Sequence, residues 1–133
     1  MKRSSCLIFV IIVQLVGYSQ TNNSIGLTEK RWKTSEILGK EISTYESIEE
    51  EAFVYLDSEG NLSGSTSCNT FNGSYNIDGK NVTLEVSTMT KMMCYDSAEI
   101  DFLEALRQTT KFSLEGQNLY LLNPTKVVMK LTQ

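Results

Sequence analysis

The sequence predicts a mainly β fold: a curled antiparallel sheet or half-open β-barrel of about seven strands, with one amphipathic helix. Apolar residues recur at every second position through much of the chain after residue 52, which is typical of strands that bury one face. A single segment, residues 97–109, changes to helical spacing. The 133 residues are 41% hydrophobic and 21% charged, which suits one globular domain with one core.

The first 19 residues have the layout of a secretory signal peptide. Residues 1–3 carry positive charge, residues 6–16 are apolar, and Gly17 and Ser19 are the small residues that precede a cleavage site after Ser19. The apolar run is shorter than the roughly 20 residues that span a membrane, and no cysteine follows it to carry a lipid. We therefore expect an exported chain, periplasmic or secreted, without a transmembrane segment or lipid anchor.

A polar stretch, residues 20–29, is expected to be a flexible lead, and residues 30–133 to form the domain. The first predicted elements are a strand from Trp32 to Ile37, a turn at residues 38–40 and a short segment at 41–42. Residues 52–56 are apolar at every position, which predicts a central strand.

Residues 62–68 alternate, so a strand there would place Leu62 and Cys68 on the core face and the intervening serines in solvent. Asp78-Gly79 predicts a tight hairpin whose two central residues have positive φ. This hairpin would join a strand containing Tyr75 to the strand of residues 82–86.

The helix predicted over residues 97–109 has apolar residues three apart at Ile100, Leu103 and Leu106, with Phe102 widening the stripe. We expect this stripe to lie on the sheet. Asp96 and Glu99 have the spacing of a capping box at the helix start. Three further strands are predicted near residues 112–114, 119–122 and 127–131.

Composition argues against several functions. The net charge is −4 and no basic run follows residue 3, which excludes an ordinary nucleic-acid surface. The chain has no histidine, the commonest general base, and no G-x-S-x-G motif. Glutamates at 46 and 49–51 are expected to be solvated charges rather than an acid–base pair. No catalytic residue is predicted.

The soft side chains of Met89, Met92, Met93 and Cys94 are close in sequence and are of the kind that binds Cu(I). Methionine is also a common filler of cores, and no histidine is present to complete a site. We therefore predict no metal and no cofactor.

Removal of the signal peptide leaves two cysteines, Cys68 and Cys94. In an exported protein two cysteines are a candidate disulfide, and their spacing is not that of a C-x-x-C redox pair. A structural disulfide is the favoured interpretation, and two buried free thiols are the alternative.

Residues 68–75, CNTFNGSY, resemble the G-C-N-x-F-x-G-x-Y signature of the META/HslJ domain family. Residues 90–94, TKMMC, resemble the family's T-x-M-A-C signature, and an early Trp32 and an E-x-x-F-L-x-A-L segment starting at Glu99 agree in order. The likeness covers about residues 30–132. Ser67 and Met93 depart from the usual glycine and alanine.

The resemblance implies a small antiparallel β fold with one helix, cysteines that occur as a pair, and no established enzymatic activity. It also implies that Asn69 bonds backbone, Gly73 permits a bend, and Phe71 and Tyr75 pack. The remaining signature positions are Trp32, Thr90 and Met92.

The expected function is that of a non-enzymatic envelope domain with a stress-related role that binds a protein partner or a small apolar ligand. One alternative is a structural or protective envelope protein without a discrete ligand. A less favoured one is an unrecognised hydrolase, which would need a pocket with a serine and a lysine or with two carboxylates.

Overall fold

The computed structural model describes residues 26–46, 50–94 and 98–133. They form nine strands, one short 3₁₀ helix and one α-helix. In chain order the elements are β1 (Lys30–Ile37), β2 (Lys40–Glu41), η1 (Ile42–Thr44), β3 (Phe53–Leu56), β4 (Asn61–Ser65), β5 (Thr70–Asp78), β6 (Asn81–Met89), α1 (Ala98–Gln108), β7 (Lys111–Glu115), β8 (Asn118–Leu122) and β9 (Val127–Thr132).

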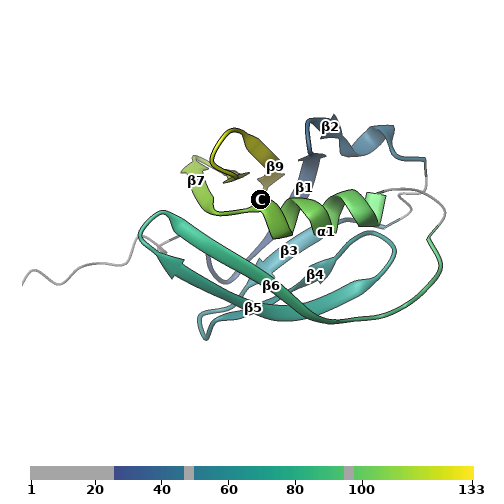
Figure 1. The fold of residues 1–133 in the computed structure, drawn as a ribbon, viewed down its shortest axis with the longest axis horizontal. Helices are drawn as coiled ribbons and strands as arrows, with labels where there is room; N and C mark the ends of the chain where they lie inside the picture. The colour runs from purple at the N-terminus through teal and green to yellow at the C-terminus, as the bar shows by residue number, and fades with distance from the viewer. Residues whose placement is uncertain (1–25, 47–49, 95–97) are drawn as a thin grey trace, which may run out of the picture.

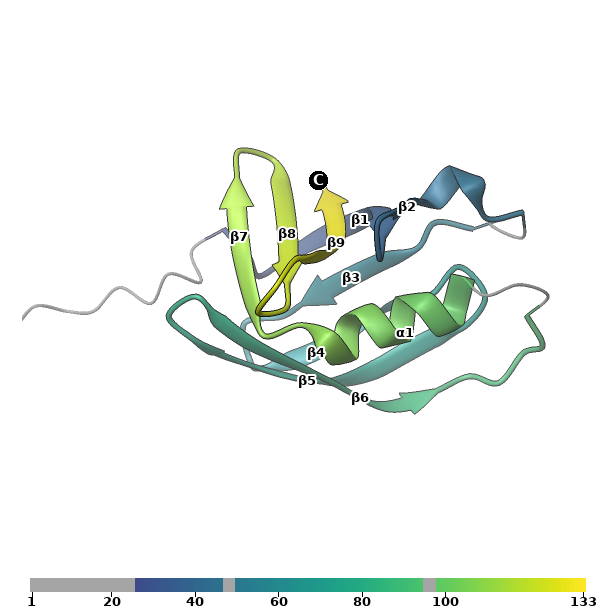
Figure 2. The same ribbon diagram turned by 45° about the horizontal axis from the view of Figure 1, so that its top comes forward.

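The strands form one antiparallel sheet in the order β2-β1-β3-β4-β5-β6-β7-β8-β9, and β9 also pairs with β1. The sheet therefore curls until its ends meet, with α1 lying inside the curl (Figure 1, Figure 2). The predicted mainly β, curled fold with one helix is confirmed. The described part has nine strands rather than about seven, and the short segment predicted at residues 41–42 corresponds to β2.

The contact between β6 and β7 is short, and it opens the sheet on one side. Only Asn81 and Lys111 are in register, flanked by hydrogen bonds from the Val82 N–H to the Thr110 carbonyl and from the Phe112 N–H to the Lys80 carbonyl, both 3.0 Å. Beyond that point β7 turns away and β6 continues beneath the helix (Figure 2). The rest of β6 and α1 thus border the open side of the curl.

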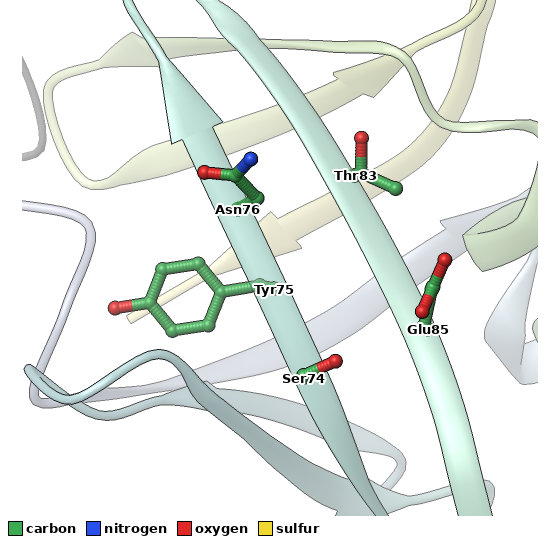
Figure 3. A pocket seen from close by; sticks show the side chains of 5 residues that line it. All are labelled: Ser74, Tyr75, Asn76, Thr83 and Glu85. Atoms are coloured by element: carbon green, nitrogen blue, oxygen red, sulfur yellow. The ribbon is translucent and has the colours of Figure 1, made fainter.

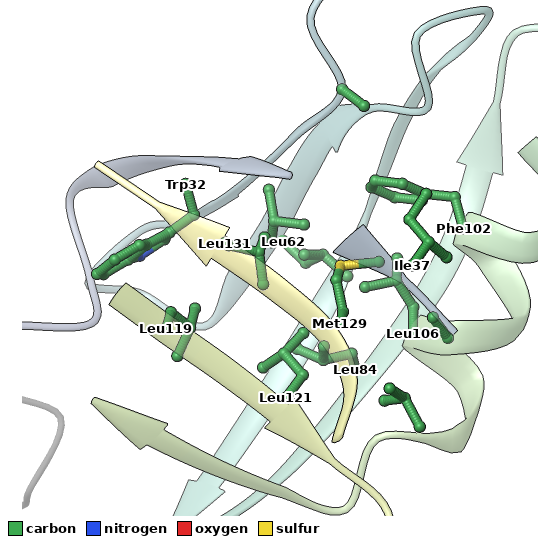
Figure 4. Close-up of a cluster of buried hydrophobic side chains, with 14 of the residues drawn as sticks. Trp32, Ile37, Leu62, Leu84, Phe102, Leu106, Leu119, Leu121, Met129 and Leu131 are labelled. Atoms are coloured by element: carbon green, nitrogen blue, oxygen red, sulfur yellow. The ribbon is translucent and has the colours of Figure 1, made fainter. Parts of the chain in front are cut away.

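The core fills the space between the sheet and the helix (Figure 4). Trp32 is completely buried, and its Nε1–H donates to the Leu27 carbonyl at 2.9 Å. The rings of Phe71 and Phe102 lie 5.7 Å apart between centroids, so β5 and α1 share an aromatic contact. Trp32 and Phe71 thus pack as core residues.

The packed structure begins earlier than residue 30. Leu27 is 1% exposed, and the Glu29 N–H donates to the Leu56 carbonyl at 2.7 Å. The Glu29 carboxylate accepts hydrogen bonds from the Tyr55 hydroxyl and the Ser58 N–H, which lower its pKa. Residues 26–29 therefore belong to the domain and not to a flexible lead. Residues 1–25, which include the predicted signal peptide, lie outside the described part.

The helix buries a different stripe from the predicted one. Its buried residues are Ala98, Phe102, Ala105 and Leu106. Leu106 and Phe102 were expected there, but Ile100 is 70% exposed and Leu103 is half-buried. The helical spacing was read correctly, but the face that meets the sheet is rotated away from Ile100.

Two local predictions, the centre of a hairpin and the end of a strand, were wrong by a few residues. The hairpin after β5 has Gly79 and Lys80 at its centre, and only Gly79 has positive φ, at 62°. Strand β4 ends at Ser65 and does not reach Cys68, because the backbone of Ser67 is left-handed with φ of 76°. Ser65 and Ser67 are buried rather than in solvent.

Candidate functional site

The two signature segments meet at the side chain of Asn69, which is 1% exposed. Its Oδ1 accepts hydrogen bonds from the Met92 N–H at 2.8 Å and the Thr90 hydroxyl at 2.9 Å. Its Nδ2 donates to the Met92 carbonyl at 3.2 Å and to Glu99 Oε2 at 2.7 Å. One amide therefore joins the β4–β5 turn, the segment after β6 and the first turn of α1.

The local sequence folds into a turn that aims Asn69 at these partners. Thr66 Oγ1 accepts a hydrogen bond from the Asn69 N–H at 2.9 Å, and the Thr66 N–H donates to the Asn69 carbonyl at 2.8 Å. The Thr66 hydroxyl also donates to Glu99 Oε2 at 2.7 Å. Glu99 was expected in a capping box with Asp96, which lies outside the described residues. In the structure the Glu99 carboxylate accepts hydrogen bonds from Thr66 and Asn69 in the β4–β5 turn.

A disulfide joins Cys68 to Cys94, with Cα atoms 6.0 Å apart. The predicted pairing is thus present in the described part of the chain, where these two cysteines are not free thiols. Both cysteines are only partly buried. The prediction that Cys68 shares the core face of a strand with Leu62 was wrong, because β4 has already ended. The bridge lies beside Asn69, whose Nδ2 is 3.4 Å from Cys94 Sγ.

The other signature residues have structural roles. The Thr90 hydroxyl accepts from the Thr70 N–H at 3.1 Å and so holds the end of β6 against β5. Gly73 lies at a β-bulge, where a Cβ would overlap the carbonyl group of Glu85. The Tyr75 hydroxyl donates to the Asp57 carbonyl, and burial raises the pKa of Tyr75.

Cys68, Cys94 and Glu99 offer three ligand atoms within 4.8 Å of one another. The two sulfurs are bonded to each other, and the Asn69 amide donates hydrogen bonds to Glu99 Oε2 and toward Cys94 Sγ. An N–H donor thus occupies the position that a cation would need. The arrangement works as a lock between segments, and it does not fit a metal.

Two shallow hollows bear on catalysis. One, of about 210 Å³, lies on the outer face of β5 and β6. Figure 3 shows polar groups of Asn76, Thr83 and Glu85 along its rim and the Tyr75 ring extending away from Thr83 and Glu85. Glu85 is the one carboxylate among the residues that line this hollow, so the hollow offers no pair of carboxylates for acid–base catalysis.

The second hollow, also of about 210 Å³, brings Lys80 and Ser113 together beside Phe112 and Leu114. Among the described residues no hydrogen bond joins the Ser113 hydroxyl to the Lys80 amine. A serine hydrolase needs that contact to activate its nucleophile.

A larger groove, of about 440 Å³, lies between the open edge of β6 and the helix. It is lined by Leu84, Glu85, Val86, Leu103, Leu106 and Arg107. Arg107 forms an ion pair with Glu104 at its rim, and this hydrogen-bonded guanidinium lowers the pKa of Glu104 to about 2. The groove is thus apolar inside and charged at one rim.

Sequence reasoning did not find this groove. Val86 and Leu103 fit the apolar patterns of a strand and a helix, and such patterns predict burial. The helix has more apolar residues than it needs to cover one face of the sheet. This surplus was the available sign of an apolar groove.

No helix in the described part of the chain is long and apolar enough to cross a membrane. The described residues form a curled antiparallel sheet around one helix, and a disulfide links the β4–β5 turn to the segment before the helix. These features define a small disulfide-bonded β-rich domain. The model of the META domain family matches residues 26–133, and the chain belongs to that family. The family suggested by the two signatures is thereby confirmed.

The fold is similar to the crystal structure of a DUF4847 family protein from Bacteroides vulgatus ATCC 8482, with 15% identity and a TM-score of 0.65 over 82% of this chain and 95% of that one. It is also similar to a protein solved by NMR, with 19% identity and a TM-score of 0.56 over 77% of this chain and 86% of the other. At these identities the likeness shows the fold alone. No curated protein matches the sequence.

Proposed function

We propose that this META domain is a non-enzymatic binding domain exported to the cell envelope, periplasmic or secreted. Its groove between β6 and α1 takes an apolar part of a protein partner or a small apolar ligand, in a role related to envelope stress. The observation that carries the proposal is the groove of about 440 Å³, with leucine and valine side chains on the β6 wall and leucine side chains on the helix wall. Apolar concavities with a few polar groups at the rim are the usual form of a ligand site.

Two further observations support this proposal. The Cys68–Cys94 disulfide is typical of proteins that leave the reducing cytoplasm. In the hollow that holds Ser113, no hydrogen bond among the described residues joins its hydroxyl to the Lys80 amine, and the hollow that holds Glu85 has no second carboxylate among its lining residues. Both observations favour binding over catalysis.

The experiment uses residues 20–133 and the apolar fluorescent probe N-phenyl-1-naphthylamine. We expect saturable binding, with NMR shift changes at Leu84, Val86 and Leu103. Leu103→Gln should weaken binding about tenfold or more, because it replaces an apolar wall with a polar amide.

The matched control is Leu114→Gln, since Leu114 is a half-buried leucine in another hollow. Binding that Leu103→Gln and Leu114→Gln weaken equally would contradict the groove as the site. The absence of saturable binding would favour the alternative, a structural or protective envelope protein without a discrete ligand.

A further inference from the structure

The exposed large apolar side chains of the described part lie in one stretch of the chain. They are Val86, Met92, Met93 and Ile100. Met92 is 64% exposed and Met93 is 85% exposed. Single exposed apolar residues are ordinary on protein surfaces, whereas several gathered in one region mark an interaction site.

These residues adjoin the groove. Ile100 and Leu103 are three positions apart on α1 and so lie on the same side of the helix. Leu103 lines the groove opposite Val86. Asn69 Nδ2 contacts both the Met92 carbonyl and Glu99, the residue before Ile100, which brings the Met92–Met93 segment next to the start of the helix.

The backbone beneath the methionines is fixed. The Asn69 side chain forms hydrogen bonds with both the N–H and the carbonyl of Met92. Two residues after Met92, Cys94 forms the disulfide with Cys68. The methionine side chains are therefore presented to solvent from an anchored segment, which lowers the ordering cost of binding. Methionine adapts its shape to varied apolar partners.

The charges around this surface identify the kind of partner. The sides of β6, residues 90–94 and α1 that border this surface carry three carboxylates, Glu85, Glu99 and Glu104, against two cations, Lys91 and Arg107. Asp101 lies on another side of the helix, where it accepts a hydrogen bond from the Tyr45 hydroxyl. Arg107 is paired with Glu104, which leaves Glu85 and Glu99 against Lys91. The surroundings are net negative, which attracts a basic segment and disfavours a second copy of the same acidic surface.

We propose that Val86, Met92, Met93, Ile100 and Leu103 form a docking surface for a segment of a partner protein that carries both apolar and Lys/Arg side chains. The proposal rests on the proposed function and names the occupant of that region. Apolar side chains of the segment lie in the groove and on the methionines, and its cations face the carboxylates.

The test uses residues 20–133 and two short probe peptides, one of alternating Lys and Leu and one of alternating Glu and Leu. We expect the Lys peptide to bind at least about tenfold more tightly, and its binding to weaken as salt rises. The double variant Met92→Gln/Met93→Gln should weaken binding of the Lys peptide at least about fivefold, because polar amides replace the apolar contacts. Both side chains are exposed, so the change should not unfold the domain. Leu114→Gln, the control, should leave it unchanged.

Equal binding of both peptides would overturn the proposal, as would binding that the double methionine variant leaves intact. Methionine-dependent self-association, or methionine-dependent binding to phosphatidylcholine vesicles without peptide binding, would also overturn it. If the naphthylamine probe still binds through Leu103 while the Lys peptide does not bind, the inference about the partner fails and the proposed function stands. If neither binds, both fail.

Discussion

The buried amide of Asn69 holds the carboxylate of Glu99, 30 residues further along the chain, at 2.7 Å. This contact joins the turn after β4 to the first turn of the helix. The same amide reaches the backbone of Met92, so one side chain fixes the turn after β4, the segment after β6 and the start of the helix. The signature asparagine is therefore a structural lock beside the proposed docking surface.

Replacement of Asn69 by Asp should destabilise the domain by about 3 kcal/mol, because the donor to Glu99 is lost and two carboxylates then face each other. Urea denaturation measures this change. Asn76→Asp is the matched control, since Asn76 is exposed on β5, and it should alter stability by less than about 0.5 kcal/mol. Equal losses in the two variants would show that the Asn69 amide is not a lock.

The disulfide should contribute about 3.5 kcal/mol, because it closes a loop between residues 26 apart in the sequence. Cys68→Ser, Cys94→Ser and the double variant should each lose this amount, since all three break the same bond. Urea denaturation with and without a phosphine reductant tests the prediction. A single variant that is as stable as the oxidised protein would contradict it.

Much of the fold follows from local patterns. Alternation over residues 82–86 and 127–131 predicted β6 and β9, and helical spacing predicted α1 to within one residue at each end. The cysteine pair also followed from the sequence. These features depend on the chain nearby or on composition, which a sequence displays directly. The role of Asn69 in bonding backbone was implied by the family resemblance instead, because its partner Met92 is distant in the sequence.

The features that were missed depend on distant partners. Strand β4 stops at Ser65 because Thr66 and Asn69 form a turn that Glu99 completes from the helix. Ile100 is exposed because the position of the sheet, and not the spacing on the helix, decides which stripe is covered. The groove exists for the same reason, so the surplus of apolar positions on the helix could signal an uncovered apolar surface but could not place it.

Gly73→Ala should destabilise the domain by about 2 kcal/mol or more, because the added Cβ overlaps the Glu85 carbonyl at the bulge and neither backbone can move freely. Gly116→Asn is the control. Gly116 has positive φ, at 61°, and open space around it, and asparagine tolerates that backbone. Thermal unfolding compares the two. A Gly73→Ala protein that melts with the wild type would show that β5 and β6 can separate there.

Stability should fall in acid through Glu104. Its pKa is lowered from 4.5 to about 2, mainly by the hydrogen bond from Arg107. A lowered pKa in the folded state means that the stabilising contribution is complete above about pH 4.5 and is lost as pH falls toward 2. Urea midpoints of the wild type and Glu104→Gln should therefore differ most above that range and converge at its acid end. Because the pair is exposed, high salt should reduce the difference. In an Arg107→Gln background, most of the stability difference that Glu104→Gln causes should also disappear. A difference between wild type and Glu104→Gln that is the same at every pH would show that the ion pair contributes nothing.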